Sequence, residues 1–396
     1  MTFHVPDHIR PLRERVYRFM TERVEPNEPL LHAGGPAADE LIAQLQSEAK
    51  AEGLWALGHP AELGGGGLPF LDYVYINEVQ GRSEYGQLAL GTWTLQDSIM
   101  LNRHASPRWR EAYLGPMVAG EISPSFAMTE PDVAGSDPTA LQTTARLEGD
   151  EWVINGRKWF TTGAARAEYT TVMCRTETDA APHASFSMII VPTSTPGYRI
   201  VRDVAVLGID SGHYEVDYDN VRVPAENLLG ERGQGFLIAQ ERLGPGRIFH
   251  AMRWLGQAQR AFDLMCDRLN ERVAFGEPLA NKQLMQKHVF DSYTEIQASR
   301  LLTLAAAEQI DGGDQARVEI GAIKVFGAQM LHNVVDRAVQ VFGAAGITDD
   351  TPLSHMYRTA RFARLYDGAD EVHIQSVGRR ILGEYRRGNG WEFGLR

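Results

Sequence analysis

The feature that most constrains the fold is a change from a helical to a strand-like sequence pattern in the middle of the chain. Between about Ser123 and Arg232, short strand-like runs follow one another, separated by Gly, Pro and Asn-Gly. On both sides of this stretch, apolar residues recur at the three-to-four spacing of helices. The strand-like runs are Thr143–Leu147, Trp152–Ile154, Thr170–Arg175, Ser185–Val191 and His213–Val223. We therefore predict a compact β domain between two helical regions.

Helices are expected in both flanking regions. Before the β domain they are predicted over Asp7–Val24, Ala37–Glu52, Phe70–Arg82 and Leu88–Leu101. After it, the helical pattern returns at Phe236 and includes Gln297–Gln309 and Arg317–Phe342. We interpret Gly64–Gly67 as a flexible connector, because no clear strand precedes it and no Lys-Ser/Thr pair of a phosphate loop follows. The expected domains are residues 1–122, 123–232 and 233–396.

Composition excludes several classes of partner. The chain carries 51 acidic and 39 basic residues, a formal net charge of −12. A field of this sign repels nucleic acid and anionic membranes, so local arginines are expected to bind any acidic ligand. No apolar run reaches membrane-spanning length and the N-terminal segment does not resemble a signal peptide, so we expect a cytoplasmic protein without membrane insertion. Cys174 and Cys266 lie far apart and outside any Cys/His cluster, which predicts two buried thiols, no disulfide and no metal site.

Two segments of the β domain indicate a ligand. Met128–Asp137 is a turn-rich loop whose Pro and Gly shape the backbone and whose Thr and Ser offer hydroxyls. Trp152–Gly163 is expected to begin as a strand, turn at Asn155-Gly156 and resume as a strand rich in aromatic residues and Thr. Two such segments can bind a ligand that is planar, polar at its edges and anionic at its tail.

Three segments of the C-terminal half add to this pattern, namely Arg272–Leu279, Gln340–Gly346 and Tyr366–His373. Together and in this order, the five segments resemble the acyl-CoA dehydrogenase family. The resemblance implies an α+β fold with an N-terminal α-helical domain, a middle β-barrel domain and a C-terminal four-helix bundle. It also implies FAD as the cofactor and a homo-oligomer, with a dimer of dimers (a homotetramer) as the common state.

The resemblance also assigns residues to FAD. In the middle domain these are Phe126, Met128, Thr129, Gly135, Ser136, Phe160 and Thr162, and in the C-terminal half they are Arg272, Phe275, Gln283, Gln340, Gly343, Ala344, Ala369 and Glu371. Phe160 stands where many relatives place a Trp over the flavin. Arg272 suits the pyrophosphate because a guanidinium donates to two oxygens at once, although it also suits a surface ion pair. Gly343 and Gly346 would approach the adenosine part of a neighbour's FAD, or simply end a helix.

The chemistry that the resemblance implies needs a base and a hydride acceptor. Asp367 would remove the α proton of an acyl thioester, and the flavin N5 would take the β hydride. The backbone N–H of Asp367 and a ribityl hydroxyl would stabilise the thioester oxygen. Most relatives carry Glu at this position, but a subgroup combines an Asp-Gly-x-Asp-Glu-Val-His segment with Arg-Leu-Gly-Pro-Gly-Arg, found here as Arg242–Arg247. Asp367 also suits a helix N-cap.

Other residues carry alternative or supporting roles. Glu241 matches the position of the base in branched-chain and long-chain relatives, and its alternative is an ordinary ion pair. The substrate is expected to contact Ser136, Arg242, Tyr366 and Gly368. Ala369 and Glu371 replace a Thr and a Gln that are usual in the family. We interpret His250 and His288 as structural histidines, and His373 is left open.

The resulting hypothesis is an oxidoreductase acting on a CH–CH group, EC class 1.3. It would convert an acyl-CoA into the trans-2-enoyl-CoA in fatty acid β-oxidation and lipid metabolism, and it would pass electrons to an electron-transfer flavoprotein. Alternatives on the same fold are a nitroalkane oxidase-like flavin oxidase or monooxygenase, a dehydrogenase acting on acyl carrier protein thioesters, and a non-catalytic flavin-binding protein. An NAD enzyme of Rossmann type is disfavoured, because no GxGxxG follows a strand and opens a helix.

Overall fold

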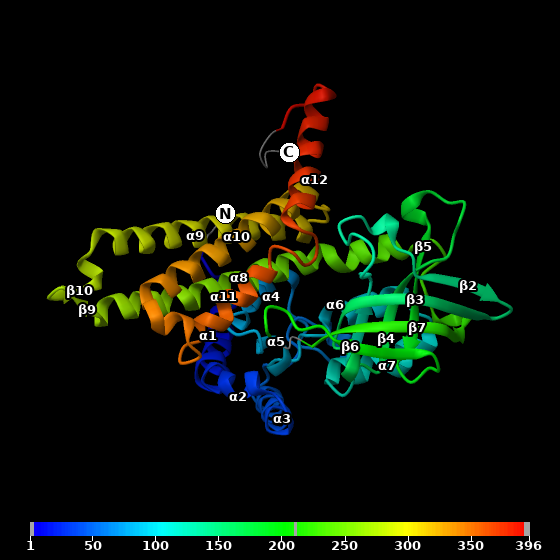
Figure 1. Ribbon diagram of the computed structural model, residues 1–396, viewed down its shortest axis with the longest axis horizontal. Helices are drawn as coiled ribbons and strands as arrows, with labels where there is room; N and C mark the ends of the chain where they lie inside the picture. The colour runs from blue at the N-terminus through cyan, green and yellow to red at the C-terminus, as the bar shows by residue number, and fades with distance from the viewer. Residues whose placement is uncertain (1–3, 210–211, 392–396) are drawn as a thin grey trace. The chain divides into compact units, whose positions relative to one another are not determined.

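A computed structural model of the protein describes residues 4–209 and 212–391 (Figure 1). The outermost residues of the first and third expected domains therefore lie outside the described residues. The chain divides into two compact units. The helical unit comprises the chain up to Leu54, Leu68–Leu90 and the chain from Gly244 onward, and the sheet unit comprises Trp55–Gly67 and Gly91–Leu243. The three domains expected from the sequence group these segments differently and remain a prediction.

Within the described residues, the sheet unit holds one eight-stranded sheet. Its spatial order is β6 (Tyr198–Asp203), β7 (His213–Pro224), β3 (Glu151–Thr162), β2 (Thr144–Glu148), β4 (Tyr169–Arg175), β5 (Phe186–Pro192) and β8 (Leu228–Leu229), and β1 (Pro124–Ala127) runs parallel to β4. Ala145 on β2, Ile189 on β5 and Val216 on β7 share one buried cluster. Strands near both ends of the order thus enclose a common core, as expected for a barrel-like domain.

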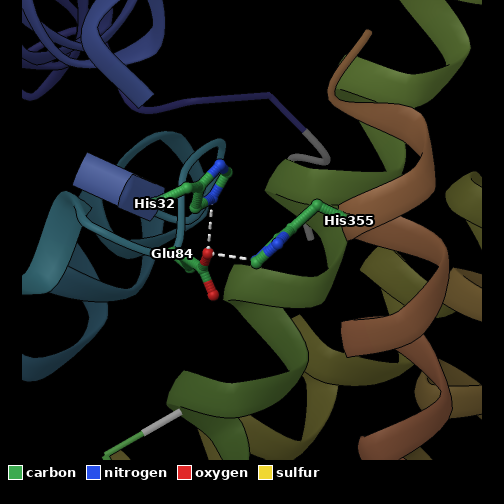
Figure 2. Close-up of side chains that lie close together, drawn as sticks. All are labelled: His32, Glu84 and His355. Atoms are coloured by element: carbon green, nitrogen blue, oxygen red, sulfur yellow. Dashed lines mark hydrogen bonds and ion pairs between the residues drawn. The ribbon is translucent and has the colours of Figure 1, made fainter. Parts of the chain in front are cut away.

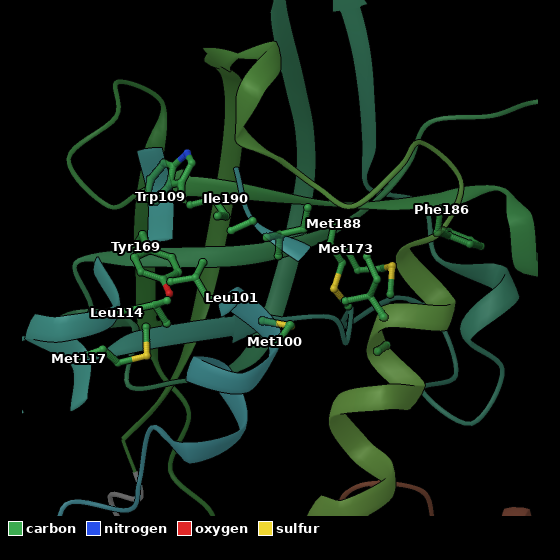
Figure 3. Close-up of a cluster of buried hydrophobic side chains, with 14 of the residues drawn as sticks. Met100, Leu101, Trp109, Leu114, Met117, Tyr169, Met173, Phe186, Met188 and Ile190 are labelled. Carbon is green, nitrogen blue, oxygen red and sulfur yellow. The ribbon is translucent and has the colours of Figure 1, made fainter. Parts of the chain in front are cut away.

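A second core lies on the other face of the same strands. Successive side chains of a strand point to opposite faces, so Val172 and Cys174 enter the first core while Tyr169 and Met173 enter the second. Figure 3 shows this second core, to which helices α6 (Leu95–His104) and α7 (Pro107–Ala119) contribute buried methionines and leucines. These helices cover the strands, so each face of β4 is shielded from water.

Both cysteines are free thiols, as predicted. Cys174 is fully buried, and burial raises the pKa of its thiol to about 12, so it stays protonated and unreactive. Cys266 is only half-buried, less than the sequence suggested.

The prediction of a turn at Asn155-Gly156 is wrong. Residues 151–162 form one continuous strand, β3, in which the pairing with β7 shifts register between Ile154 and Gly156. Gly156 has φ +150°, and a Cβ atom there would lie 2.5 Å from the Thr143 hydroxyl oxygen. The dipeptide is therefore a bulge inside a long strand, where only glycine fits, and the partner strand β7 overrides the local turn signal.

The helical unit is built from the remaining helices. The N-terminal ones are α1 (Arg10–Phe19), α2 (Glu28–Ala33), α3 (Pro36–Ala51), α4 (Phe70–Gln80) and α5 (Gly86–Ala89). The others are α9 (Gln283–Asp311), α10 (Arg317–Phe342), α11 (Leu353–Phe362), α12 (Asp370–Arg386) and the part of α8 (Gly235–Glu271) that follows Leu243. A short hairpin of β9 (Val273–Ala274) and β10 (Glu277–Pro278) joins α8 to α9. Helix α10 packs against α9, α11 and α12.

Ion pairs, some buried and some partly exposed, connect the N-terminal helices to the C-terminal ones. Arg260 on α8 donates to Glu28 on α2 at 2.7 Å, and Arg300 on α9 donates to Glu78 on α4 at 2.7 Å. Arg82, which follows α4, donates to Asp263 on α8 at 3.0 Å. Each pair joins residues that lie far apart in the sequence, so these contacts specify how the helices of this unit assemble.

The helix expected over Leu88–Leu101 is broken. It is replaced by α5, which ends at Ala89, and α6, which begins at Leu95. Gly91 lies between them with φ +67°, and a Cβ atom there would lie 2.4 Å from the indole ring of Trp55. The helix stops because the backbone must approach Trp55 closely.

The Gly64–Gly67 run is also more ordered than predicted. The backbone N–H groups of Gly65, Gly66 and Gly67 donate to the carbonyls of Pro60, Ala56 and His59. The run is therefore a hydrogen-bonded turn rather than a flexible connector. No helix of the described chain is both long and apolar enough to cross a lipid bilayer.

Candidate functional site

Asp367 lies in the turn between α11 and α12 of the helical unit. Its backbone has φ +54°, a left-handed conformation that residues other than glycine rarely adopt. Phe160 and Phe275, two of the residues assigned to FAD by resemblance, have positive φ values as well. Such strain persists only where the surroundings impose it, and it is concentrated at functional positions.

The surroundings of Asp367 impose this geometry through its carbonyl oxygen. Arg247 donates to that oxygen from Nε at 3.3 Å and from Nη2 at 3.2 Å, and His373 Nε2 donates to it at 3.1 Å. The buried ammonium of Lys324 donates to the next carbonyl, that of Gly368, at 3.1 Å and to that of Ala363 at 2.7 Å. Donors from α8, α10 and α12 therefore hold this turn.

The carboxylate of Asp367 has its own partner, because His250 Nε2 lies 3.0 Å from Oδ2. The other ring nitrogen, Nδ1, lies 2.8 Å from Arg253 Nη2, and a guanidinium can only donate. Nδ1 is therefore the acceptor, which places the imidazole proton on Nε2, facing the carboxylate. Burial and the charge of Arg253 lower the pKa of His250 to about 4, so the ring is neutral at pH 7 and donates this hydrogen bond.

Burial shapes the other titratable groups of the turn. It lowers the pKa of Lys324 to about 8, against the opposing charges of Asp367 and Asp370. It also lowers the pKa of His373 to about 4, with a further contribution from the charge of Arg247. The Asp367 side chain contacts His250 and is 26% exposed, so it is held in place and still accessible to a substrate.

The alternative interpretation of Asp367 as a helix N-cap is wrong. The N-cap of α12 is Ala369, whose side chain cannot accept a hydrogen bond. Asp370, the first residue of α12, is buried and accepts from Arg364 at 2.8 Å and Gln329 at 3.2 Å. Glu371 is exposed on the first turn of the helix.

Tyr366 precedes the catalytic candidate. Its hydroxyl accepts a hydrogen bond from the indole N–H of Trp254 at 2.8 Å, and burial raises the pKa of this phenol to about 12. Tyr366 thus presents a neutral aromatic ring beside Asp367. Gly368, the other turn residue assigned to the substrate, contributes the carbonyl that Lys324 binds.

In the sheet unit, a buried ion pair positions the loop assigned to the flavin. Lys158 on β3 is fully buried and donates to Glu130 at 2.8 Å and to the Met128 carbonyl at 2.9 Å. Glu130 also accepts the backbone N–H groups of Gln142 and Thr143. The backbone N–H of Trp159 donates to the Thr129 carbonyl at 3.0 Å. Met128 and Thr129 are therefore held against β3, the strand that also carries Phe160 and Thr162.

Phe160 and Thr162 lie at the end of this strand. The Phe160 ring is 39% exposed, and Thr162 Oγ1 lies 2.8 Å from His213 Nδ1. Gly135 and Ser136 are exposed further along the loop. The sheet unit therefore combines an accessible aromatic ring, a hydroxyl and exposed loop backbone.

The Arg242–Asp97 and Glu241–His104 pairs also belong to the sheet unit. Arg242 binds Asp97 through two hydrogen bonds of 3.0 Å, and its guanidinium lies 4.5 Å from the ring centre of Phe126. Glu241, the alternative base, lies 2.7 Å from His104 Nε2. This contact is consistent with the ordinary ion pair that is the alternative interpretation of Glu241, and the choice between the two interpretations stays a prediction.

The remaining residues assigned to FAD are exposed on the helical unit. They are Arg272, Phe275, Gln283, Gln340, Gly343 and Ala344. Among the residues that the structure describes, no carboxylate pairs with Arg272, so its guanidinium is available to an anion. The Phe275 ring is 98% exposed, which is unusual for an apolar side chain. Gly343 follows the last residue of α10 with φ +62°, so it also serves as the helix terminator.

These residues fit FAD. A flavin needs an aromatic surface with hydrogen-bonding groups at its edge, which Phe160, Thr162 and the Thr129 loop supply. A pyrophosphate needs an unpaired guanidinium, which Arg272 supplies. Ala369 offers no side-chain hydrogen bond in place of the usual Thr.

The residues that support Asp367 are not predicted from the sequence. His250 was interpreted as structural, and Arg247, Arg253 and Lys324 were not assigned. One signal was available: Arg247, His250 and Trp254 are spaced three and four residues apart and share one face of a helix. A second signal was Lys324, a charged residue inside the otherwise apolar face of the predicted helix Arg317–Phe342.

Comparisons with known proteins agree with this geometry. Three family models match, described as the N-terminal, middle and C-terminal domains of acyl-CoA dehydrogenase, over residues 6–121, 125–221 and 233–382. The chain is 45% identical to the probable acyl-CoA dehydrogenase FadE2 of Mycobacterium tuberculosis, over 93% of this chain and 94% of that protein. It is 38% identical to human acyl-CoA dehydrogenase family member 11, of which it spans 48%.

A solved structure agrees as well. Butyryl-CoA dehydrogenase of Megasphaera elsdenii superposes with a TM-score of 0.85 at 28% identity, covering 96% of this chain and all of that one. Fold, site geometry and sequence similarity therefore lead to one conclusion: this chain belongs to the acyl-CoA dehydrogenase family, the FAD-dependent oxidoreductases that act on CH–CH groups.

Proposed function

We propose that this protein dehydrogenates the α,β bond of an acyl-CoA thioester with Asp367 as the catalytic base. Asp367 would remove the α proton, and FAD, held by the residues assigned to it, would supply the redox chemistry for loss of the β hydride. The product is the trans-2-enoyl-CoA. Electrons then pass to an electron-transfer flavoprotein, as part of fatty acid β-oxidation.

The observation that carries this proposal is the support of the Asp367 turn. Its carboxylate is accessible and oriented by His250, while Arg247 and His373 hold its carbonyl in a strained conformation. A base needs this kind of positioning, since its oxygen must meet one carbon-bound proton in a defined direction. A purely structural aspartate would be served by fewer contacts and an unstrained backbone.

Glu241 receives less support as the base. It lies on α8 in an ion pair with His104, and its backbone is helical. Arg242 next to it is engaged with Asp97, so we assign Arg242 to organising the substrate side of the sheet unit. Ser136, Tyr366 and Gly368 are proposed to contact the thioester.

The exposed residues at the end of α8 and in the turn after α10 support a second part of the proposal. Phe275 exposes an apolar ring next to Arg272, an arrangement that a partner surface would bury. We propose that a neighbouring copy of the chain covers this hairpin, that the two copies complete each other's FAD site, and that pairs of dimers form the tetramer.

An anaerobic titration with acyl-CoAs of graded chain length tests the reaction. The flavin absorbance of the FAD-loaded protein should bleach with at least one thioester, and Asp367→Asn should keep FAD but lose the bleaching. Glu241→Gln and the exposed control Asp350→Asn should bleach as the wild type does. If Asp367→Asn reduces its flavin and Glu241→Gln does not, the base assignment is reversed.

The same titration separates the alternatives. A yellow protein that ignores every acyl-CoA but reacts with nitroalkanes and oxygen is an oxidase. One that reacts only with acyl carrier protein thioesters is a carrier-linked dehydrogenase. Reoxidation of the reduced protein by an electron-transfer flavoprotein, and its slow reoxidation by oxygen, would support the proposed electron acceptor.

A further inference from the structure

A cluster of two histidines and one glutamate lies in the helical unit, apart from the residues assigned to FAD and substrate. Figure 2 shows His32 from α2, Glu84 from the segment between α4 and α5, and His355 from α11. The three side chains point toward one another, although they come from three separate parts of the sequence. Each offers one atom capable of binding a metal, and these three atoms lie within 4.8 Å of one another.

Both imidazoles direct the same nitrogen at the same oxygen. His32 Nε2 lies 2.9 Å from Glu84 Oε1, and His355 Nε2 is in ion-pair contact with that oxygen as well. The two rings stack with centroids 3.8 Å apart and an angle of 25° between their planes. His355 Nε2 is buried, and it makes no hydrogen bond of good geometry to any described residue. The two ring nitrogens thus converge on one point beside the carboxylate.

The neighbouring cations do not compete for this carboxylate. Arg82 pairs with Glu25 at 2.8 Å and with Asp263 at 3.0 Å. Arg260 pairs with Glu28 at 2.7 Å. The charge of Glu84 is therefore directed at the two imidazoles.

The cluster also has room for a small additional ligand. A cavity of about 20 Å³ is lined by His32, Glu84 and His355, and its other walls include the paired residues Glu28, Arg82 and Arg260. That volume holds about one water molecule. The side chains are 26%, 35% and 15% exposed in the same order, so an ion can enter from solvent.

We propose that His32, Glu84 and His355 form a binding site for a divalent cation of the zinc type, with water as the fourth ligand. Two imidazole nitrogens and one carboxylate oxygen are a ligand set that Zn²⁺ favours, in tetrahedral geometry with bonds of about 2.0–2.2 Å. Hard cations such as Mg²⁺ favour oxygen ligands and are disfavoured here. The ion would join α2, the segment before α5 and α11. Its role is therefore to brace the helical unit and does not depend on the proposed reaction.

Zinc binding to the FAD-loaded, full-length protein tests this proposal. After treatment with a chelator and its removal, we expect ZnCl₂ to bind with one ion per chain by calorimetry and metal analysis, and to raise the Tm. His32→Ala, His355→Ala and Glu84→Gln should each weaken Zn²⁺ binding by at least the roughly 10–100-fold seen when a residue that merely supports a metal ligand is lost. MgCl₂ at the same concentration should have no effect on the Tm.

A matched control separates the cluster from surface histidines. His8 forms an exposed pair with Asp72 at 2.8 Å in the same unit, and no third ligand joins them among the residues that the structure describes, so His8→Ala should bind Zn²⁺ as the wild type does. Anomalous scattering at the zinc edge from zinc-soaked crystals of the wild type should place the ion between the three side chains, a readout that does not need a folded variant. Absence of Zn²⁺ binding by the wild type, or equal binding by all variants, would overturn the site. The flavin titration is unaffected by either outcome, so failure here and failure of the proposed function are distinguishable.

Discussion

His250 donates a hydrogen bond from Nε2 to the Asp367 carboxylate, over 3.0 Å. The proton position follows from Arg253, which donates to Nδ1 at 2.8 Å and so leaves Nε2 as the donor. Burial keeps the imidazole neutral at pH 7. Arg253, His250 and Asp367 therefore form one directed chain that holds a carboxylate oxygen in place, and we assign His250 as a positioning residue.

Replacing His250 should reduce turnover more than binding. His250→Ala leaves the carboxylate free to rotate. A misplacement of a reacting group by about 1 Å can cost about 100-fold in kcat, and we expect a loss of that order. We expect KM for the best acyl-CoA and the FAD content to change little. His250→Gln, whose amide can both accept from Arg253 and donate to Asp367, should recover part of the rate. Stopped-flow flavin reduction measures the effect, and an unchanged kcat in His250→Ala would contradict the positioning role.

Breaking the Lys158–Glu130 pair should destabilise the protein and loosen the flavin loop. Lys158→Met leaves Glu130 buried without its cation, which costs about 3–5 kcal/mol of unfolding free energy. Glu130→Gln in the same chain removes the unpaired charge and should restore part of this loss. Urea unfolding and retention of FAD on a desalting column measure both effects. If the double variant is no more stable than Lys158→Met, the charge is not the cause.

His59 should make the sheet unit sensitive to acid. It is fully buried, and burial lowers the pKa of its imidazole to about 4, below the ordinary value of 6.5. The unfolded chain therefore binds a proton at a higher pH than the folded chain does. This contribution to stability is complete above about pH 6.5 and is lost as the pH falls toward 4, by about 2 kcal/mol between pH 7 and pH 5.

The comparison of wild type with His59→Gln isolates this contribution, because other buried histidines titrate equally in both proteins. Glutamine keeps a donor for the Thr94 hydroxyl but does not titrate. As the pH falls from 7 to 5, the unfolding free energy of the wild type should decrease by more than that of the variant. A difference that stays constant from pH 7 to pH 5 would argue against a buried neutral imidazole.

Gly91→Ala should be strongly destabilising. The new methyl group would overlap the Trp55 indole at 2.4 Å, and φ +67° is unfavourable for any residue with a side chain. Overpacking and backbone strain together cost about 2–5 kcal/mol. Gly378→Ala is the control, since it lies in α12 with no atom within 4 Å of the new Cβ and should stabilise the helix slightly. Urea unfolding measures the unfolding free energy of both variants. If both change it by a similar amount, the Trp55 contact is unimportant.

Phe275→Ser should weaken self-association. The wild-type ring is 98% exposed on a single chain, and its burial by a neighbouring copy would remove apolar surface from water. We expect the variant to elute at lower mass in light scattering and to hold FAD more weakly. The exposed leucine of β2, changed in Leu147→Ser, is a control of similar chemistry. A wild-type protein that is already monomeric would overturn the proposed assembly.

Much of the fold was readable from the sequence, because element type depends on residues close together in the chain. The predicted helix Arg317–Phe342 coincides with α10, and Phe70–Arg82 differs from α4 by only two residues at one end. The strand-like runs all correspond to strands. The predictions are wrong where a distant residue decides the local structure. Close approach to Trp55 ends a helix before Gly91, and pairing with β7 keeps Asn155-Gly156 within a strand instead of a turn.

The candidate site shows the same division. The sequence by itself predicts that the Tyr366–His373 segment and the Met128–Asp137 loop carry functional groups, because their order along the chain resembles a family pattern. Only the tertiary structure decided that His250 orients Asp367, that Lys158 anchors the flavin loop and that His32, Glu84 and His355 converge. These contacts join residues from separate helices and strands. Spacing along the sequence can place residues on one face of a helix, but it does not reveal these pairings, since it is the packing of those elements that brings the side chains together.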